Sequence, residues 1–121
     1  MTQRPLHFCI IERDLFIASD MRAGLELASP GCHVHHLRDM DEVNGSTPEN
    51  GTIFITKLAL ADLDPSGLHA LAQRVQGRIV LRDGTDSEDA VIGQGHDRLP
   101  SPFSNRDLRE LVERLHNGGA E

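Results

Sequence analysis

The sequence predicts an α/β domain in which helices cover both faces of a mostly parallel, five-stranded sheet. Short apolar runs, among them LHFCII, GTIFIT and RIVLR, are too short for helices and suit strands that are buried on both faces. Between these runs, apolar residues recur at helical spacing, as at Ile17, Met21, Leu25 and Ala28. Strands that alternate with helices pair in parallel, because each helix returns the chain to the same end of the sheet.

The expected elements follow one another along nearly the whole chain. The strands are placed at 6–11, 32–37, 51–56, 78–82 and 98–99. The helices are placed at 15–28, 39–43, 68–75 and 87–92, with a last one from 104 onward. Ser87 and Ser104 are expected to cap the last two. Residues 57–66 are interpreted as a loop, in which Asp64 caps a helix that begins near Pro65.

Length and composition limit the classes of function. The 121 residues fit one domain over 1–121, with a core at about 6–116 and a flexible tail at 117–121. A net charge of −7 disfavours binding to nucleic acids and to anionic membranes. Neither a membrane span nor a signal peptide is recognisable, so a cytoplasmic location is expected. Cys9 and Cys32 are expected to be reduced thiols.

Charged residues follow the carboxyl ends of the predicted strands, where open α/β sheets bind their ligands. Three cations and three acids are expected to meet there: Glu12, Arg13, Asp14, Lys57, Arg82 and Asp83. Converging cations would repel a divalent metal, which prefers several carboxylate ligands. An internal ion-pair network, for instance of Lys57 with Glu12 or Asp14, is the preferred interpretation. Binding of an anion by Arg13, Lys57 and Arg82 stays open as an alternative.

Three segments resemble the receiver domains of two-component response regulators: FCIIERDLFIASDMRAGLELASPG, IFITKLALADLDPSGLHAL and GHDRLPSPFSNRDLRELVERL. In that order they are similar to the first strand, acidic turn and first helix, to the third strand with its loop and helix, and to the last strand, lysine-proline turn and last helix. The resemblance runs from about Leu6 to Leu115. It implies a doubly wound, flavodoxin-like, three-layer α/β/α fold with strand order 2-1-3-4-5.

The resemblance also implies where family members carry out phosphoryl chemistry, and this sequence departs from most of those positions. The acidic metal-binding pair falls on Glu12 and Arg13. The phospho-accepting aspartate falls on Lys57, which cannot form an acyl phosphate. The positions of the Ser/Thr switch, the lysine and the switch aromatic fall on Arg82, Ser101 and Arg98. A pseudo-receiver that is not phosphorylated is therefore expected.

Such a domain is expected to be no enzyme, to hold no cofactor, and to have lost or weakened its binding of Mg²⁺. Lys57 would then act as the permanent counter-ion of Glu12 and Asp14. Two alternatives stay open. One is an atypical receiver that is phosphorylated at Asp14 or Asp62, and the other is a sensor of an anion or small ligand in the cationic pocket.

Signalling is expected to proceed through a protein partner, which would be a histidine kinase, a regulator or an output protein. The resemblance places a partner or dimer face on the last strand and helix. Its candidate residues are Arg98, Phe103, Leu108, Leu111 and Leu115. A homodimer through this face is left open.

Three histidines, His33, His35 and His36, lie together on the second expected strand. Alternation along a strand places His33 and His35 on one face and His36 on the other. A closed metal site needs about four ligands, which this spacing does not supply, so no metal site is predicted. The resemblance places this strand at the sheet edge, where polar side chains hinder edge-to-edge pairing. A role in pH sensing is a weaker alternative.

Overall fold

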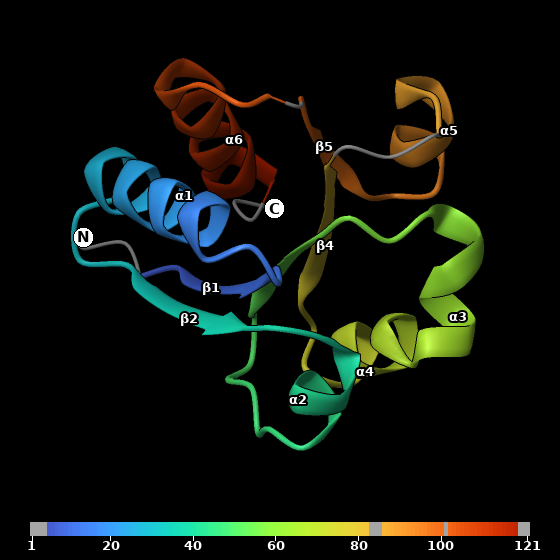
Figure 1. Ribbon diagram of the computed structural model, residues 1–121. Coiled ribbons are helices and arrows are strands. Elements are labelled where there is room, and N and C mark those ends of the chain that lie inside the picture. The colour runs from blue at the N-terminus through green and yellow to red at the C-terminus, as the bar shows by residue number, and fades with distance from the viewer. Residues whose placement is uncertain (1–4, 83–85, 101, 119–121) are drawn as a thin grey trace.

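The computed structural model describes residues 5–82, 86–100 and 102–118 and has the α/β architecture that the sequence predicts (Figure 1). Within these ranges, five strands form one parallel sheet in the order β2-β1-β3-β4-β5. The predicted fold class and strand order are therefore confirmed. The strands are β1 (His7–Ile11), β2 (His33–Leu37), β3 (Ile53–Thr56), β4 (Arg78–Arg82) and β5 (Asp97–Leu99).

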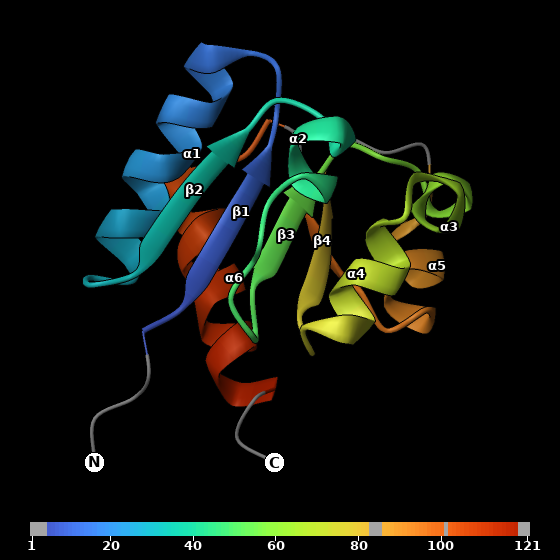
Figure 2. The same ribbon diagram turned by 90° about the horizontal axis from the view of Figure 1, so that it is seen from below.

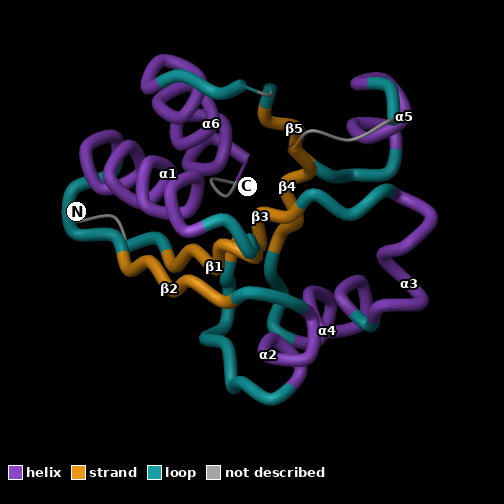
Figure 3. Tube along the Cα trace, in the orientation of Figure 1, coloured by secondary structure: helices purple, strands orange, loops and turns teal. Residues whose placement is uncertain are grey.

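Helices cover both faces of this sheet (Figure 2). On one face lie α1 (Leu15–Ala28) and α6 (Asn105–Gly118), which pack so closely that a Cβ on Gly24 would lie 2.3 Å from Leu108 Cδ1. Figure 3 shows α2 and α4 across the sheet from α1. The remaining helices are α2 (Met40–Asn44), the 3-10 helix η1 (Leu60–Asp62), α3 (Leu63–Ser66), α4 (Leu68–Arg74) and α5 (Glu88–Gly93).

Two apolar layers, one on each face of the sheet, form the core. Alternate residues of a strand point to opposite faces, so strands covered on both sides are apolar throughout. The layer beneath α1 and α6 contains Phe8, Ile10, Met21, Leu25, Ile53, Ile55, Val80, Leu99, Leu108 and Leu111. The opposite layer contains Cys9, Ile11, Val43, Phe54, Leu63, Leu68, Leu71, Ile79, Leu81 and Val91. This two-sided burial accounts for the continuous apolar runs in the sequence.

Segment 57–66 differs from the prediction. It was expected to be a loop, but it contains η1 and α3. The prediction that Asp64 caps a helix is wrong, because Asp64 lies inside α3 and Asp62 precedes that helix without a capping hydrogen bond from its side chain. The physical reason is that Pro65 is tolerated in the first turn of a helix, where its missing N–H is not needed. The helix therefore begins before Pro65 rather than at it.

The two predicted serine caps are confirmed. Ser87 Oγ accepts the main-chain N–H of Ala90 at 3.1 Å, at the start of α5. Ser104 Oγ accepts the N–H of Asp107 at 3.2 Å, and the Asp107 carboxylate accepts the N–H of Ser104 at 2.8 Å. This reciprocal pair is a capping box, which fixes where α6 begins.

The turn before β4 depends on glycine. A Cβ at Gly77 would lie 2.2 Å from the carbonyl oxygen of Thr52, too close for any side chain. The glycine therefore lets the chain pass tightly beside the residue that precedes β3.

Within the described ranges, no helix combines the length and the apolar character that crossing a membrane requires.

Candidate functional site

Three parallel strands, β1, β3 and β4, bring Glu12, Lys57 and Arg82 together at the edge of the sheet that is formed by the carboxyl ends of the strands. Ile10 pairs with Ile55, and Thr56 pairs with Leu81. Continuing both registers places Glu12 level with Lys57, and Lys57 level with Arg82. The sequence predicted this convergence from the rule that ligand sites lie beyond the carboxyl ends of the strands.

Glu12 is the centre of the cluster. Glu12 and Arg82 are each only 3% exposed, and Arg82 Nη2 contacts Glu12 Oε1 in an ion pair. Lys57 Nζ lies 3.8 Å from the same oxygen, and Glu12 Oε2 accepts the main-chain N–H of Asp14 at 2.9 Å. Both carboxylate oxygens thus have partners, which is what a carboxylate removed from water requires.

The two cations around Glu12 are not equivalent. The Lys57 side chain is 49% exposed, whereas the Arg82 side chain is enclosed with Glu12. An ion pair that is half in water contributes little, because solvent screens it. The guanidinium of Arg82 is therefore the main counter-ion, and the sequence-based emphasis on Lys57 underestimated it.

Asp14 does not share this arrangement. It was expected to be a second acid beside Lys57, but it is the N-cap of α1 instead. Its carboxylate accepts the N–H of Phe16 at 2.9 Å and that of Ile17 at 3.3 Å. Aspartate is one of the residues that best satisfy the free N–H groups at a helix start, which explains the difference.

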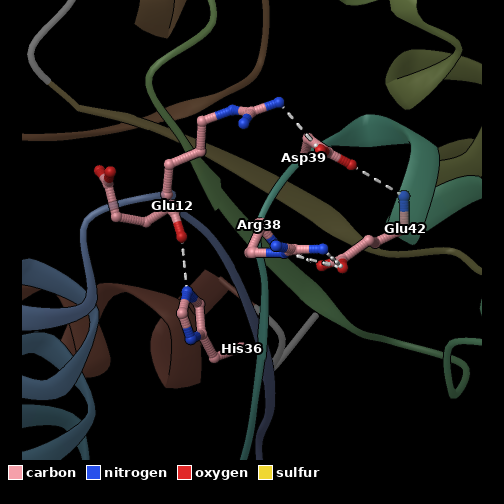
Figure 4. A network of polar contacts seen from close by, with 6 residues as sticks. Glu12, His36, Arg38, Asp39 and Glu42 are labelled. Carbon is pink, nitrogen blue, oxygen red and sulfur yellow. Dashed lines mark hydrogen bonds and ion pairs between the residues drawn. The ribbon is translucent and has the colours of Figure 1, made fainter.

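A second set of polar contacts ties β2 and α2 to the same edge. Figure 4 shows His36 reaching from β2 to the main chain of Glu12, where its Nε2–H donates to the carbonyl oxygen at 2.5 Å. Arg13 points into solvent and pairs with Asp39 at 3.0 Å. Asp39 also caps α2 by accepting the N–H of Glu42 at 3.1 Å. Arg13 therefore lies outside the buried cluster around Glu12, although its side chain and that of Lys57 line one cavity at this end of the sheet.

A cavity of about 450 Å³ opens beside this edge. Its charged lining combines three cations and three acids: Glu12, Arg13, Arg38, Asp39, Lys57 and Asp62. Arg38 pairs with Glu42 at 3.0 Å. Sequence reasoning missed Arg38 and Asp39, although polar residues directly after the second strand were a usable signal. Asp83 and Ser101 lie outside the described residues.

The described residues do not fit a divalent metal at this edge. Mg²⁺ needs oxygen ligands with open lone pairs, and the buried carboxylate here already faces a guanidinium and an ammonium group. Within the described ranges, no group of three or more His, Cys, Asp or Glu side chains is arranged to hold a metal ion. The arrangement is that of a neutralised ion cluster.

The predicted partner face is only partly at the surface. Leu108, Leu111 and Leu115 are buried in the core layer beneath α6, so they cannot contact a partner. Their apolar periodicity reflects packing against the sheet. Arg98 and Phe103 are partly exposed, so these two remain available to a partner.

The histidines of β2 lie on an edge strand. His33 stacks on His7 of β1, with ring centroids 4.7 Å apart. Arg22 of α1 reaches over the edge and donates to the carbonyl of Val34 at 2.6 Å. The edge is thus partly covered by a charged side chain, as expected for a strand that avoids pairing with other chains.

Cys9 and Cys32 are free thiols, and burial raises the pKa of the Cys9 thiol to about 12.

Comparison with known proteins supports the fold. No protein-family model and no curated protein sequence matches this chain. The crystal structure of a candidate response regulator from Chloroflexus aurantiacus J-10-fl is similar, with a TM-score of 0.62 and 19% sequence identity. The match covers 93% of this chain and 98% of that chain. The chain therefore has a receiver-like, flavodoxin-type α/β fold.

Proposed function

We propose that this chain is a pseudo-receiver, a signalling domain that works without phosphorylation and acts by binding other proteins. The observation that carries the proposal is the ammonium group of Lys57 at the end of β3, 3.8 Å from a buried glutamate. In the receiver family that this sequence resembles, the corresponding position holds the aspartate that accepts phosphate. An amine at this position cannot form the acyl phosphate.

The surrounding charges support the same proposal. Phosphoryl transfer to a carboxylate needs a metal ion that neutralises the charge of the phosphate. Here Arg82 and Lys57 already neutralise Glu12, so Mg²⁺ would have to compete with two covalently held cations. Loss of Mg²⁺ binding, absence of enzymatic activity and action in a two-component-type pathway are parts of the proposal. The partner would be a kinase, a regulator or an output protein.

A phosphorylation assay tests the proposal. The full chain is incubated with Mg²⁺ and acetyl phosphate, a small phosphodonor, and its intact mass is measured. We expect no change in mass, whereas a stoichiometric gain of one phosphoryl group would contradict the proposal. In that event, Asp14→Asn and Asp62→Asn would test the atypical receiver by locating the acceptor. Both aspartates are exposed, but Asp62 lines the cavity, whereas the Asp14 carboxylate caps α1.

A second candidate function is the sensing of a small anion. The cavity at the strand ends favours it, because the side chains of Arg13, Arg38 and Lys57 are 76, 66 and 49% exposed there. Each of these cations also pairs with an acid, which an anion would have to displace. Titration of the ¹⁵N-labelled chain with inorganic phosphate decides the matter. Absence of NMR shifts at these three residues with millimolar phosphate would remove this candidate.

A further inference from the structure

Exposed apolar surface is concentrated on α1. In the described residues, the large hydrophobic side chains that are exposed include Leu15, Phe16 and Leu27 of α1, at 67, 86 and 71%. The fourth, Ile92, belongs to α5. The large apolar side chains of α6 lie in the core, so α6 offers no comparable surface. A helix that leaves such side chains in water is a candidate for a protein interface.

These residues form a stripe rather than a scatter. With 3.6 residues per turn, Phe16, Ala23 and Leu27 fall within about 40° of one another on the helix surface. All three are exposed. The stripe is about 16 Å long, with Ala23 and the exposed carboxylate of Asp20 between Phe16 and Leu27, and with Leu15 about 100° around the helix from Phe16. We call Leu15, Phe16, Ala23 and Leu27 the α1 stripe. Its spacing suits a single partner helix laid along α1.

The charges beside the α1 stripe are negative and unpaired. Asp20 and Glu26 are exposed, and no ion pair is formed by either among the described residues. The nearby cations are engaged elsewhere. Arg22 donates to the carbonyl of Val34, and Arg13 pairs with Asp39. The stripe therefore offers apolar anchors beside free carboxylates.

We propose that the α1 stripe docks an amphipathic helix of a partner protein, in which lysines or arginines flank the apolar side chains. This inference rests on the proposed function, because it names the surface through which the pseudo-receiver would bind its partner. The apolar contacts would supply affinity, and the carboxylates would attract and orient a basic helix. A net charge of −7 on the whole chain favours the same class of partner.

A second copy of the chain fits this surface less well. Two-fold symmetry would set two α1 helices antiparallel, with Phe16 of one copy opposite Leu27 of the other. The same symmetry would bring the two Asp20 side chains close together on one side of the seam. Like charges that meet without a cation oppose association. A basic helix instead supplies the missing positive charge.

The docking surface is tested with the ¹⁵N-labelled full chain and a synthetic peptide. The probe is a helix-forming peptide of about 18 residues, or five turns, with leucines in one stripe and lysines on both sides of it. A matched peptide carries glutamate in place of each lysine. We expect NMR shift changes centred on α1, and binding of the glutamate peptide weaker by about tenfold or more.

Matched variants separate the α1 stripe from apolar surface in general. Phe16→Ser and Leu27→Ser change exposed side chains, so both variants should fold, and each should weaken binding of the lysine peptide by about tenfold. Ile92→Ser removes exposed apolar surface on α5 and should leave binding unchanged. Equal binding by all variants would overturn the proposal. Shift changes away from α1 would overturn it too, as would self-association that the α1 substitutions abolish. None of these outcomes affects the phosphorylation assay, so the two proposals fail separately.

Discussion

Replacing Arg82 by methionine tests how much the buried ion pair contributes to stability. Glu12 and Arg82 are each 3% exposed, so the change removes the main charge facing a buried carboxylate and keeps a long side chain. Removing one partner of a buried pair costs about 3–5 kcal/mol, since the other charge is left uncompensated. Lys57 is half exposed and still faces the carboxylate at 3.8 Å. We therefore expect the free energy of unfolding to fall by about 3 kcal/mol, the lower end of that range.

Two further variants serve as controls for this magnitude. Lys57→Met breaks a half-exposed pair and should cost less than about 1 kcal/mol. The double variant Glu12→Gln, Arg82→Met removes both charges, while the amide oxygen can still accept the N–H of Asp14. It should therefore be more stable than Arg82→Met alone, because no buried charge is left without a partner.

Urea unfolding followed by circular dichroism gives the required free energies, since the chain contains no Trp or Tyr to report by fluorescence. A double-mutant cycle then isolates the coupling between Glu12 and Arg82. The reasoning is refuted if Arg82→Met and Lys57→Met lower stability by the same small amount. It is also refuted if the effects of the two substitutions at positions 12 and 82 simply add.

Three further predictions concern helix capping, histidine titration and the sheet edge. In urea unfolding, Asp14→Ala should lower the free energy of unfolding by about 1 kcal/mol, and Asp14→Asn should lower it much less, because asparagine also caps a helix. Equal losses of stability in the two variants would contradict a pure capping role. Burial, and then the charge of His69, lower the pKa of His96, so the unfolded chain binds the proton more readily. The stability from His96 should therefore be present above about pH 6.5 and be lost as the pH falls through its lower folded pKa. His96→Gln should make the free energy of unfolding, measured with urea at several pH values, depend less on pH. The same pH dependence in the variant and in the unaltered chain would contradict this role of His96. Arg22→Ala uncovers the carbonyl of Val34 at the β2 edge, so sedimentation should show more self-association than for the unaltered chain. An unchanged sedimentation profile would argue against edge protection.

The fold was predictable because the residues of both core layers follow regular apolar patterns along the chain. Strands buried on both faces appear as runs such as GTIFIT, and α1 begins and ends where its periodicity does. The meeting of Glu12, Lys57 and Arg82 was also predictable, since parallel strands end at a common edge. None of these inferences required knowledge of how a side chain is oriented.

Features that depend on side-chain direction and depth were not predictable. The sequence gives Asp14 and Glu12 the same chemistry, yet one caps α1 and the other is buried beneath Arg82. Likewise, Leu111 of α6 and Phe16 of α1 are both apolar residues in amphipathic helices. Leu111 is fully buried and Phe16 is 86% exposed. Apolar periodicity marks a helix, but only the packing shows which apolar residues are left for a partner.

The identity of the cation beside Glu12 bears directly on what the domain can do. A metal ion dissociates, so a site that uses one can exist in bound and free states whose populations differ with conditions. A guanidinium group belongs to the chain, and Arg82 is enclosed with Glu12, so this cation cannot leave without local unfolding. A ligand can shift a conformational equilibrium only by its differential affinity for the two states. In the proposed function, the cluster is always neutralised, so Mg²⁺ and phosphate would bind two conformations of the domain with nearly equal affinity and could not shift the equilibrium between them. Regulation would then have to act through the amount of the protein or through the partner that binds it.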